Sequence, residues 1–152
     1  MHSSRKYGLL LVFFLICYGT AAFASQFGPG DWYESLQRAP WTPPDLAFPI
    51  VWTILYALIA VSGWLLFLQS SRLPKVLWVV QLLLNAAWSW LFFGEHWVGL
   101  ALFDIVALGL VLAILIPVAI AQGQRAAGFM LVPYLVWIAL ASSLNAYVVL
   151  YN

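Results

Sequence analysis

The sequence predicts an all-α membrane protein that crosses the bilayer five times. Of its residues, 65% are hydrophobic and only 7% are charged, whereas about 25% of residues are charged in soluble domains. Five long stretches contain no Lys, Arg, Asp or Glu: 7–30, 46–71, 76–94, 105–124 and 126–152. Each is long enough to cross about 30 Å of hydrocarbon as a helix. We therefore expect a polytopic five-transmembrane-helix bundle forming one domain over residues 1–152, with helices near 7–25, 46–69, 76–93, 97–121 and 128–150.

The connections between these helices differ in length. The last four helices are joined by short connections, so consecutive helices should pack as antiparallel neighbours. The first two are separated by a long loop, residues 26–45, whose prolines and aromatic residues favour an ordered structure. At its end we expect Thr42 to cap the second helix. Pro49, Pro117 and Pro133 should interrupt the second, fourth and fifth helices.

The distribution of positive charge predicts the orientation. Only Arg38 falls on one side of the bilayer, and all the other basic residues fall on the opposite side: Arg5, Lys6, Arg72, Lys75 and Arg125. Loops rich in Lys and Arg stay in the cytoplasm. We therefore expect a cytoplasmic N-terminus and a C-terminus outside.

The composition argues against several classes of function. A net charge of +1 without a basic run makes nucleic acid an unexpected partner. Cys17 is the only cysteine, which excludes a disulfide framework and a thiolate zinc site. His2 and His96 lie outside the predicted helices, so no histidine is placed to bind haem iron inside the bundle. We expect no metal site, no required cofactor, and no conventional hydrolase or kinase chemistry.

Nine tryptophans invite two explanations. Those near helix ends, Trp64, Trp78 and Trp97, should anchor the chain at the level of the lipid headgroups. Others share a helical face with polar residues at three- and four-residue spacing. These stripes are Trp52 and Tyr56 in the second helix, Gln81, Asn85 and Trp88 in the third, and Tyr134, Trp137, Ala141 and Asn145 in the fifth.

Two interpretations of these stripes stay open. The amide side chains can hold neighbouring helices together through interhelical hydrogen bonds, with the tryptophans as bulky packing groups. Alternatively, the three stripes converge on one cavity, because flat aromatic walls with a few fixed polar groups are typical of small-molecule pockets. Such a cavity would suit a planar, largely apolar ligand.

Asp104 is the only acidic residue predicted within a helix. An intramembrane acid is either a proton-relay group or a hydrogen-bonded structural group. Asp104 lies about two turns from the start of its helix and has no basic partner in any span, which favours the structural role near the outer interface. In the same helix, Gly109 and Ala113 form a small-xxx-small pair that is compatible with a homodimer.

Three segments carry an ordered set of motifs. The first runs from Trp32-Tyr33 through Pro40-Trp41-Thr42-Pro43-Pro44 and Phe48 to Trp52-Thr53-Ile54-Leu55-Tyr56. The second joins Gln81-Leu82-Leu83-Leu84-Asn85-Ala86-Ala87-Trp88 to Phe92-Phe93-Gly94, and the third joins Pro133-Tyr134-Leu135-Val136-Trp137 to Ala141-Ser142-Ser143-Leu144-Asn145. Together with Asp104 in the fourth helix, this pattern resembles the TspO/MBR family of translocator proteins and tryptophan-rich sensory proteins over nearly the whole chain.

The resemblance implies a pocket that opens toward the loop 26–45, which acts as a lid. It implies a membrane-embedded binding protein, a sensor or carrier, for tetrapyrroles such as protoporphyrin and for sterol-like or drug-like hydrophobic ligands. It also implies a multi-pass protein of the bacterial cytoplasmic (inner) membrane, with porphyrin as a ligand and not a cofactor. Animal members have a cholesterol motif that needs a basic residue near the C-terminus, and none follows Arg125 here.

Carried over by motif, the implied ligand-binding residues lie in the bundle and on the lid: Trp52, Tyr56, Asn85, Trp88, Trp137, Ala141 and Asn145, with Trp32 and Trp41 on the lid. Trp52 and Trp137 would stack on the ligand. We also expect Arg38 to pair with a porphyrin propionate. Two alternatives remain, a light-dependent porphyrin-degrading activity that uses Trp52 and Trp137, and a proton-coupled exporter that uses Asp104.

Overall fold

The apolar stretches form long helices in the computed structural model, which describes residues 3–68 and 71–152. In chain order the elements are α1 (Ser3–Ser25), α2 (Asp31–Ser35), α3 (Ala47–Phe67), α4 (Arg72–Ser89), the π-helical turn η1 (Trp90–Gly94), α5 (Val98–Ala121), α6 (Arg125–Met130) and α7 (Val132–Tyr151). Within the described residues, five helical segments are long and apolar enough to cross a membrane: 4–25, 47–67, 72–94, 98–121 and 125–151. The predicted five-span, all-α architecture is confirmed.

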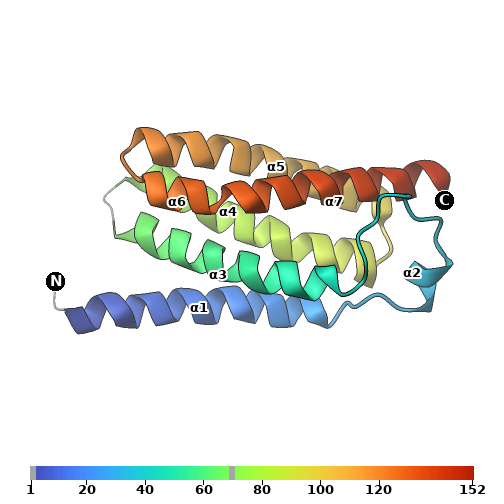
Figure 1. Cartoon of the computed structure of the whole chain (residues 1–152), viewed down its shortest axis with the longest axis horizontal. Helices are drawn as coiled ribbons and strands as arrows, with labels where there is room; N and C mark the ends of the chain where they lie inside the picture. Colours follow the sequence, from blue (N-terminus) through green and yellow to red (C-terminus); the bar gives the residue numbers. More distant parts are fainter. Residues whose placement is uncertain (1–2, 69–70) are drawn as a thin grey trace.

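The five spans lie side by side along the longest axis of the molecule, with α1 at one edge of the bundle (Figure 1). Consecutive spans run antiparallel, as predicted. The most extensive packing joins α4 to α5, α5 to α7, and α1 to α3. The start of α1 and the end of α7 lie at opposite ends of the bundle, and α2 lies at the end that holds the C-terminus.

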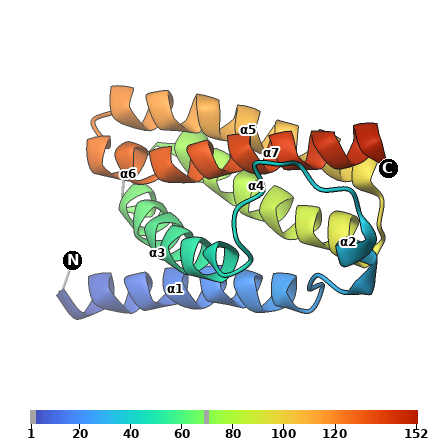
Figure 2. The same ribbon diagram turned by 45° about the vertical axis from the view of Figure 1, so that its right-hand side comes forward.

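Residues 26–46 connect α1 to α3 and are called the lid below. From α2 the lid passes along α7 before it descends to α3 (Figure 2). The basic residues at the starts of α1, α4 and α6 all lie at the opposite end of the bundle, and only Arg38 lies at the lid end. This distribution agrees with the charge pattern; which end faces the cytoplasm stays a prediction.

Helix α5 illustrates how the core is built. Its buried residues recur every three or four positions and form one stripe against α4 and α7: Ala101, Ile105, Leu108, Leu112 and Leu115. Apolar residues on the other faces are exposed, as expected of a helix whose outer surface meets lipid. Of the predicted small-residue pair, Ala113 is exposed and Gly109 is half-buried. A Cβ added to Gly109 would lie 3.7 Å from Ile138 of α7. Dimerisation stays a prediction.

Trp78 is not an interfacial anchor, so that prediction is wrong. Only 2% of its surface is exposed, and its Nε1–H donates to the carbonyl oxygen of Ile59 at 3.0 Å. The indole fits because α3 has a glycine beside it, and a Cβ added to Gly63 would lie 2.4 Å from Trp78 Cε2. Trp97 is exposed, and Trp64 is half-buried, with its Nε1–H donating to the Lys6 carbonyl.

The predicted cap of the second span is also wrong. Helix α3 begins at Ala47, five residues after Thr42, and no side chain caps it. The Thr42 hydroxyl instead donates to the carbonyl oxygen of Ala39 at 2.7 Å and closes a turn inside the lid. A local hydrogen bond of this kind competes with capping, because Ser and Thr satisfy nearby backbone groups in several conformations.

The three prolines have different effects on their helices. Pro49 lies in the first turn of α3, where its missing N–H costs little, so the predicted interruption is wrong there. Helix α5 continues past Pro117 to Ala121, so it is not ended by this proline. Pro133 follows a break at Leu131 that divides the last span into α6 and α7, as predicted.

Candidate functional site

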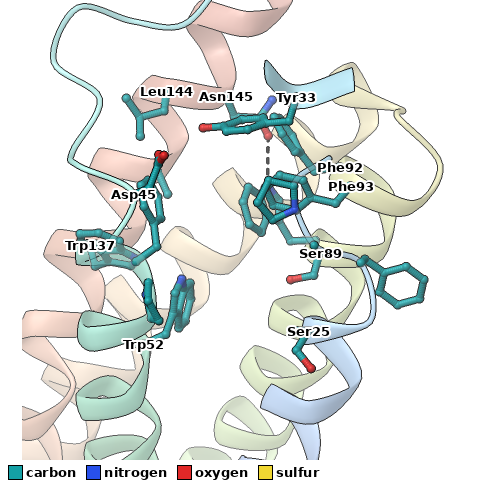
Figure 3. A pocket seen from close by; sticks show the side chains of 18 of the residues that line it. Ser25, Tyr33, Asp45, Trp52, Ser89, Phe92, Phe93, Trp137, Leu144 and Asn145 are labelled. Atoms are coloured by element: carbon teal, nitrogen blue, oxygen red, sulfur yellow. Dashed lines mark hydrogen bonds between the residues drawn. The ribbon is translucent and has the colours of Figure 1, made fainter. Parts of the chain in front are cut away.

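The lid end of the bundle contains a cavity of about 860 Å³. Ligand pockets in proteins typically measure about 300 to 1,000 Å³. Side chains from α1, the lid, α3, α4, η1 and α7 line it (Figure 3). Ten lining residues are aromatic: Tyr18, Phe27, Tyr33, Phe48, Trp52, Tyr56, Trp88, Phe92, Phe93 and Trp137.

Two aromatic walls face each other across this cavity. Trp52 of α3 and Trp137 of α7 lie on one side, and Phe92 and Phe93 of η1 lie on the other (Figure 3). The Trp52 ring packs on the Tyr56 ring, with 5.4 Å between the ring centroids. Flat hydrophobic faces in this arrangement suit a planar guest, which can stack on aromatic rings.

The π-helical turn η1 shapes the second wall. Its wide turn is closed by a hydrogen bond from the backbone N–H of Glu95 to the Trp90 carbonyl oxygen, at 2.9 Å. An extra residue per turn shifts the helical register, and both Phe92 and Phe93 line the cavity beside Trp88. The Trp88 and Phe92 rings stack at 5.3 Å with an interplanar angle of 25°.

Gly94 ends this turn and permits a close approach from the lid. A Cβ at this position would lie 2.9 Å from Cδ1 of Phe27, the second residue after α1. The absent side chain therefore lets Phe27 close one side of the cavity. Nothing in the local sequence around Phe27 indicated this role.

Asn145 fixes the position of Trp88. The Trp88 Nε1–H donates to Asn145 Oδ1 at 3.0 Å. The Asn145 side chain, labelled in Figure 3, also donates through Nδ2 to the carbonyl oxygen of Val98 at 2.8 Å. One amide thus links α4, α5 and α7. Asn145 is almost fully buried, so its two hydrogen bonds satisfy groups that water cannot reach.

Asn85 lies behind the first wall and does not line the cavity. Its Oδ1 accepts a hydrogen bond from the Tyr56 hydroxyl at 2.6 Å, and its Nδ2 donates to the Tyr134 hydroxyl at 2.7 Å. The implied direct contact of Asn85 with a ligand has no support in this geometry. Gln81, one turn earlier, is fully buried, and neither of its amide atoms has a hydrogen-bond partner among the described residues.

The lid is fastened to the rest of the protein by stacked rings and hydrogen bonds. The Trp32 ring stacks on His96 at 3.9 Å and 8°. The Trp41 Nε1–H donates to Ser143 Oγ of α7 at 3.1 Å. The backbone N–H of Gln37 donates to Asn152 Oδ1 at 2.8 Å, and Asn152 Nδ2 donates to the Gln37 carbonyl oxygen at 3.1 Å. Trp32 and Trp41 therefore belong to the lid, as the resemblance implied, but they hold it in place and do not line the cavity.

The structure brings most of the predicted site residues together. The cavity is lined by Arg38, Trp52, Tyr56, Trp88, Trp137, Ala141 and Asn145, whereas Trp32, Trp41 and Asn85 lie outside its lining. Both interpretations of the stripes apply. Residues of all three stripes line the one cavity, and the asparagines also form hydrogen bonds to neighbouring helices. Sequence reasoning did not single out the phenylalanines of the lining, although Phe92 and Phe93 belong to a recognised motif.

Asp104 lies on α5, half-buried and outside the cavity lining. Its Oδ2 is buried and has no hydrogen-bond partner among the described residues, so the predicted hydrogen bond is missing at that oxygen. Across residues 3–68 and 71–152, no group of three or more His, Cys, Asp or Glu side chains is placed to hold a metal. His2 lies outside the described residues.

The amino-acid sequence is similar to those of known proteins. Residues 9–151 match the sequence model of the TspO/MBR family. Protein CrtK of Rhodobacter capsulatus is 33% identical over 142 residues, which cover 90% of this chain and 88% of that protein. The tryptophan-rich protein TspO of Chlorobaculum tepidum is 38% identical over 125 residues, 77% of each chain. The translocator protein of Bos taurus is 36% identical over 120 residues, covering 75% of this chain and 70% of that protein.

Proposed function

Because the chain belongs to the TspO/MBR family of membrane proteins, we propose that it is a sensor or carrier whose cavity binds planar hydrophobic molecules. Tetrapyrroles such as protoporphyrin are the leading ligand class, and sterol-like or drug-like molecules would compete for the same space. The observation that supports this proposal is the cavity of about 860 Å³ with Trp52 and Trp137 on one wall and phenylalanines on the other.

Stacking gives the proposal a measurable magnitude. Each aromatic pair contributes about 0.5 to 1.5 kcal/mol beyond the burial of its surface, so removing one indole should weaken binding about two- to tenfold. We expect this loss in Trp52→Ala and in Trp137→Ala, measured by titration of protoporphyrin absorbance with purified protein. Trp97→Ala is the matched control, since Trp97 is exposed and outside the cavity. Equal affinity in all four proteins would reject the cavity as the binding site.

A second activity is favoured by the position of the same two indoles. Trp52 and Trp137 come from different helices and line one wall of the cavity, where oxidisable side chains would lie beside a bound photosensitiser. The alternative is light-dependent breakdown of porphyrin. Under illumination in air, porphyrin absorbance should fall faster with the natural protein than with a Trp52→Phe, Trp137→Phe double variant. Equal rates would indicate ordinary photobleaching.

Export coupled to protons is a third possibility, through Asp104. In this case Asp104→Asn should abolish pH-driven transport in vesicles and leave porphyrin binding unchanged. Retained transport would remove Asp104 from the mechanism.

We also propose that the protein is inserted in the bacterial cytoplasmic membrane with its N-terminus in the cytoplasm. The charge distribution supports this orientation, and bacterial relatives support the location. Lys75→Cys should then react with a membrane-impermeant maleimide only from the cytoplasmic side, and Gln37→Cys only from outside. Both positions are exposed or half-buried, whereas the natural Cys17 is buried. The opposite labelling pattern would reverse the topology.

A further inference from the structure

The charged residues of the cavity lining all belong to the lid: Glu34, Arg38 and Asp45. Arg38 and Asp45 form an ion pair, with Arg38 Nη1 3.7 Å from Asp45 Oδ1. The guanidinium carbon of Arg38 also lies 5.3 Å from the centroid of the Tyr33 ring. The only cationic group of the lining is thus held between the two halves of the lid.

This ion pair borders two hollow spaces. A second recess of about 480 Å³ lies beside the cavity and is bordered by Pro43 and Pro44. Arg38, Ala39, Thr42 and Asp45 line both the recess and the main cavity. The Arg38–Asp45 pair therefore borders both spaces. Asp45 lies on the same side of the cavity as Trp52 and Trp137 in the close view (Figure 3).

The pair is weak enough to be exchanged. The Asp45 side chain is 90% exposed and the Arg38 side chain is 37% exposed, and ion pairs between exposed groups contribute little because water and salt screen them. The guanidinium is the less exposed partner, and the Tyr33 ring limits its orientation. Its planar set of donors matches a carboxylate in a bidentate arrangement. A ligand carboxylate can thus take the place that Asp45 leaves.

We infer that the Arg38–Asp45 pair is a carboxylate-exchange site at the mouth of the cavity. The inference rests on the proposed function and specifies its ligand class, which is a planar hydrophobic molecule that carries a carboxylate. The body of the ligand stacks within the aromatic walls while its carboxylate replaces Asp45 on Arg38. A tetrapyrrole acid meets both requirements, and a neutral sterol meets only the first.

The test compares protoporphyrin with its dimethyl ester, which has the same ring system and no acid. Affinities for both are measured with the full chain in lipid nanodiscs. The natural protein should prefer the acid, and Arg38→Gln should abolish this preference. Asp45→Asn removes the competing carboxylate, so it should strengthen binding of the acid by about two- to fivefold relative to the ester. Arg125→Gln, at the other end of the bundle, is the control for a general change of charge.

Opposite effects of the two variants would distinguish exchange from damage to the lid, which would weaken both ligands in both variants. An acid preference that persists in Arg38→Gln, or weaker acid binding in Asp45→Asn, would overturn the inference. Stronger acid binding in Arg38→Gln would also overturn it, because the Arg38 cation would then not attract the ligand carboxylate. If ester binding depends on Trp52 but the natural protein binds the acid and the ester equally well, only the exchange site is refuted and the proposed function stands. If neither ligand depends on Trp52, the proposed function and the inference both fail.

Discussion

Replacing Gly63 by alanine would push a methyl group into the indole of Trp78. The added Cβ would lie 2.4 Å from Cε2, 2.5 Å from Cζ2 and 2.7 Å from Nε1 of that ring. The indole would have to move, and its hydrogen bond to the Ile59 carbonyl would be lost. Overpacking costs about 1 to 3 kcal/mol and an unsatisfied buried group about 1 to 3 kcal/mol. We therefore expect the free energy of unfolding to fall by about 2 to 6 kcal/mol.

The protein contains a convenient reporter for this experiment. Cys17 is the only cysteine in the sequence and is fully buried, so a thiol-reactive fluorescent dye will report unfolding on heating. Gly8→Ala is the matched control, because a Cβ at Gly8 has no atom within 4 Å and alanine is favoured over glycine in a helix by about 0.5 to 1 kcal/mol. Gly63→Ala should melt well below the natural protein and Gly8→Ala at or slightly above it. Equal melting of Gly63→Ala and the natural protein would refute the tight contact with Trp78.

Three further substitutions test other parts of the structure. Gly128→Ala would place a Cβ 3.1 Å from a carbonyl oxygen of α5, and we expect the same melting assay to show a loss of about 1 to 3 kcal/mol; an unchanged melt would contradict that packing. Asn85→Leu leaves two buried tyrosine hydroxyls without their amide partner, so stability should fall by about 1 to 3 kcal/mol, and a neutral effect would mean that the hydroxyls find other partners. Trp41→Phe keeps a ring but loses the hydrogen bond to Ser143. Trypsin should then cut the lid after Arg38 faster, and equal cleavage rates would show that this bond does not hold the lid.

The number of spans could be predicted because the bilayer has a fixed thickness and charges are excluded from it. The ends of the spans were less predictable. Helix α4 begins at Arg72, before Lys75, because a helix can extend its charged first turn beyond the hydrocarbon. The burial of Trp78 depends on Gly63, fifteen residues earlier on another helix. No local pattern contains this information.

The site was predictable where helical periodicity controls it. Trp52, Tyr56, Trp137 and Asn145 share faces with their stripe partners, and a face that avoids lipid has to point into the bundle. The lid follows different rules, because its path depends on contacts with distant residues such as Ser143. The π-helical turn was also unpredictable, since it requires no particular residue type.

The anchor of the lid on α7 has a mechanical consequence. Ser143 is two residues from Ala141 and from Asn145, so it lies on the opposite side of the helix from the cavity. The indole of Trp41 is 52% exposed there and packs on Tyr147, near the end of a span where rings of this kind settle among lipid headgroups. Opening of the lid would therefore move the Trp41 side chain through the headgroup region of the bilayer. We therefore expect the rate of lid opening to depend on headgroup size and to differ between a micelle and a bilayer.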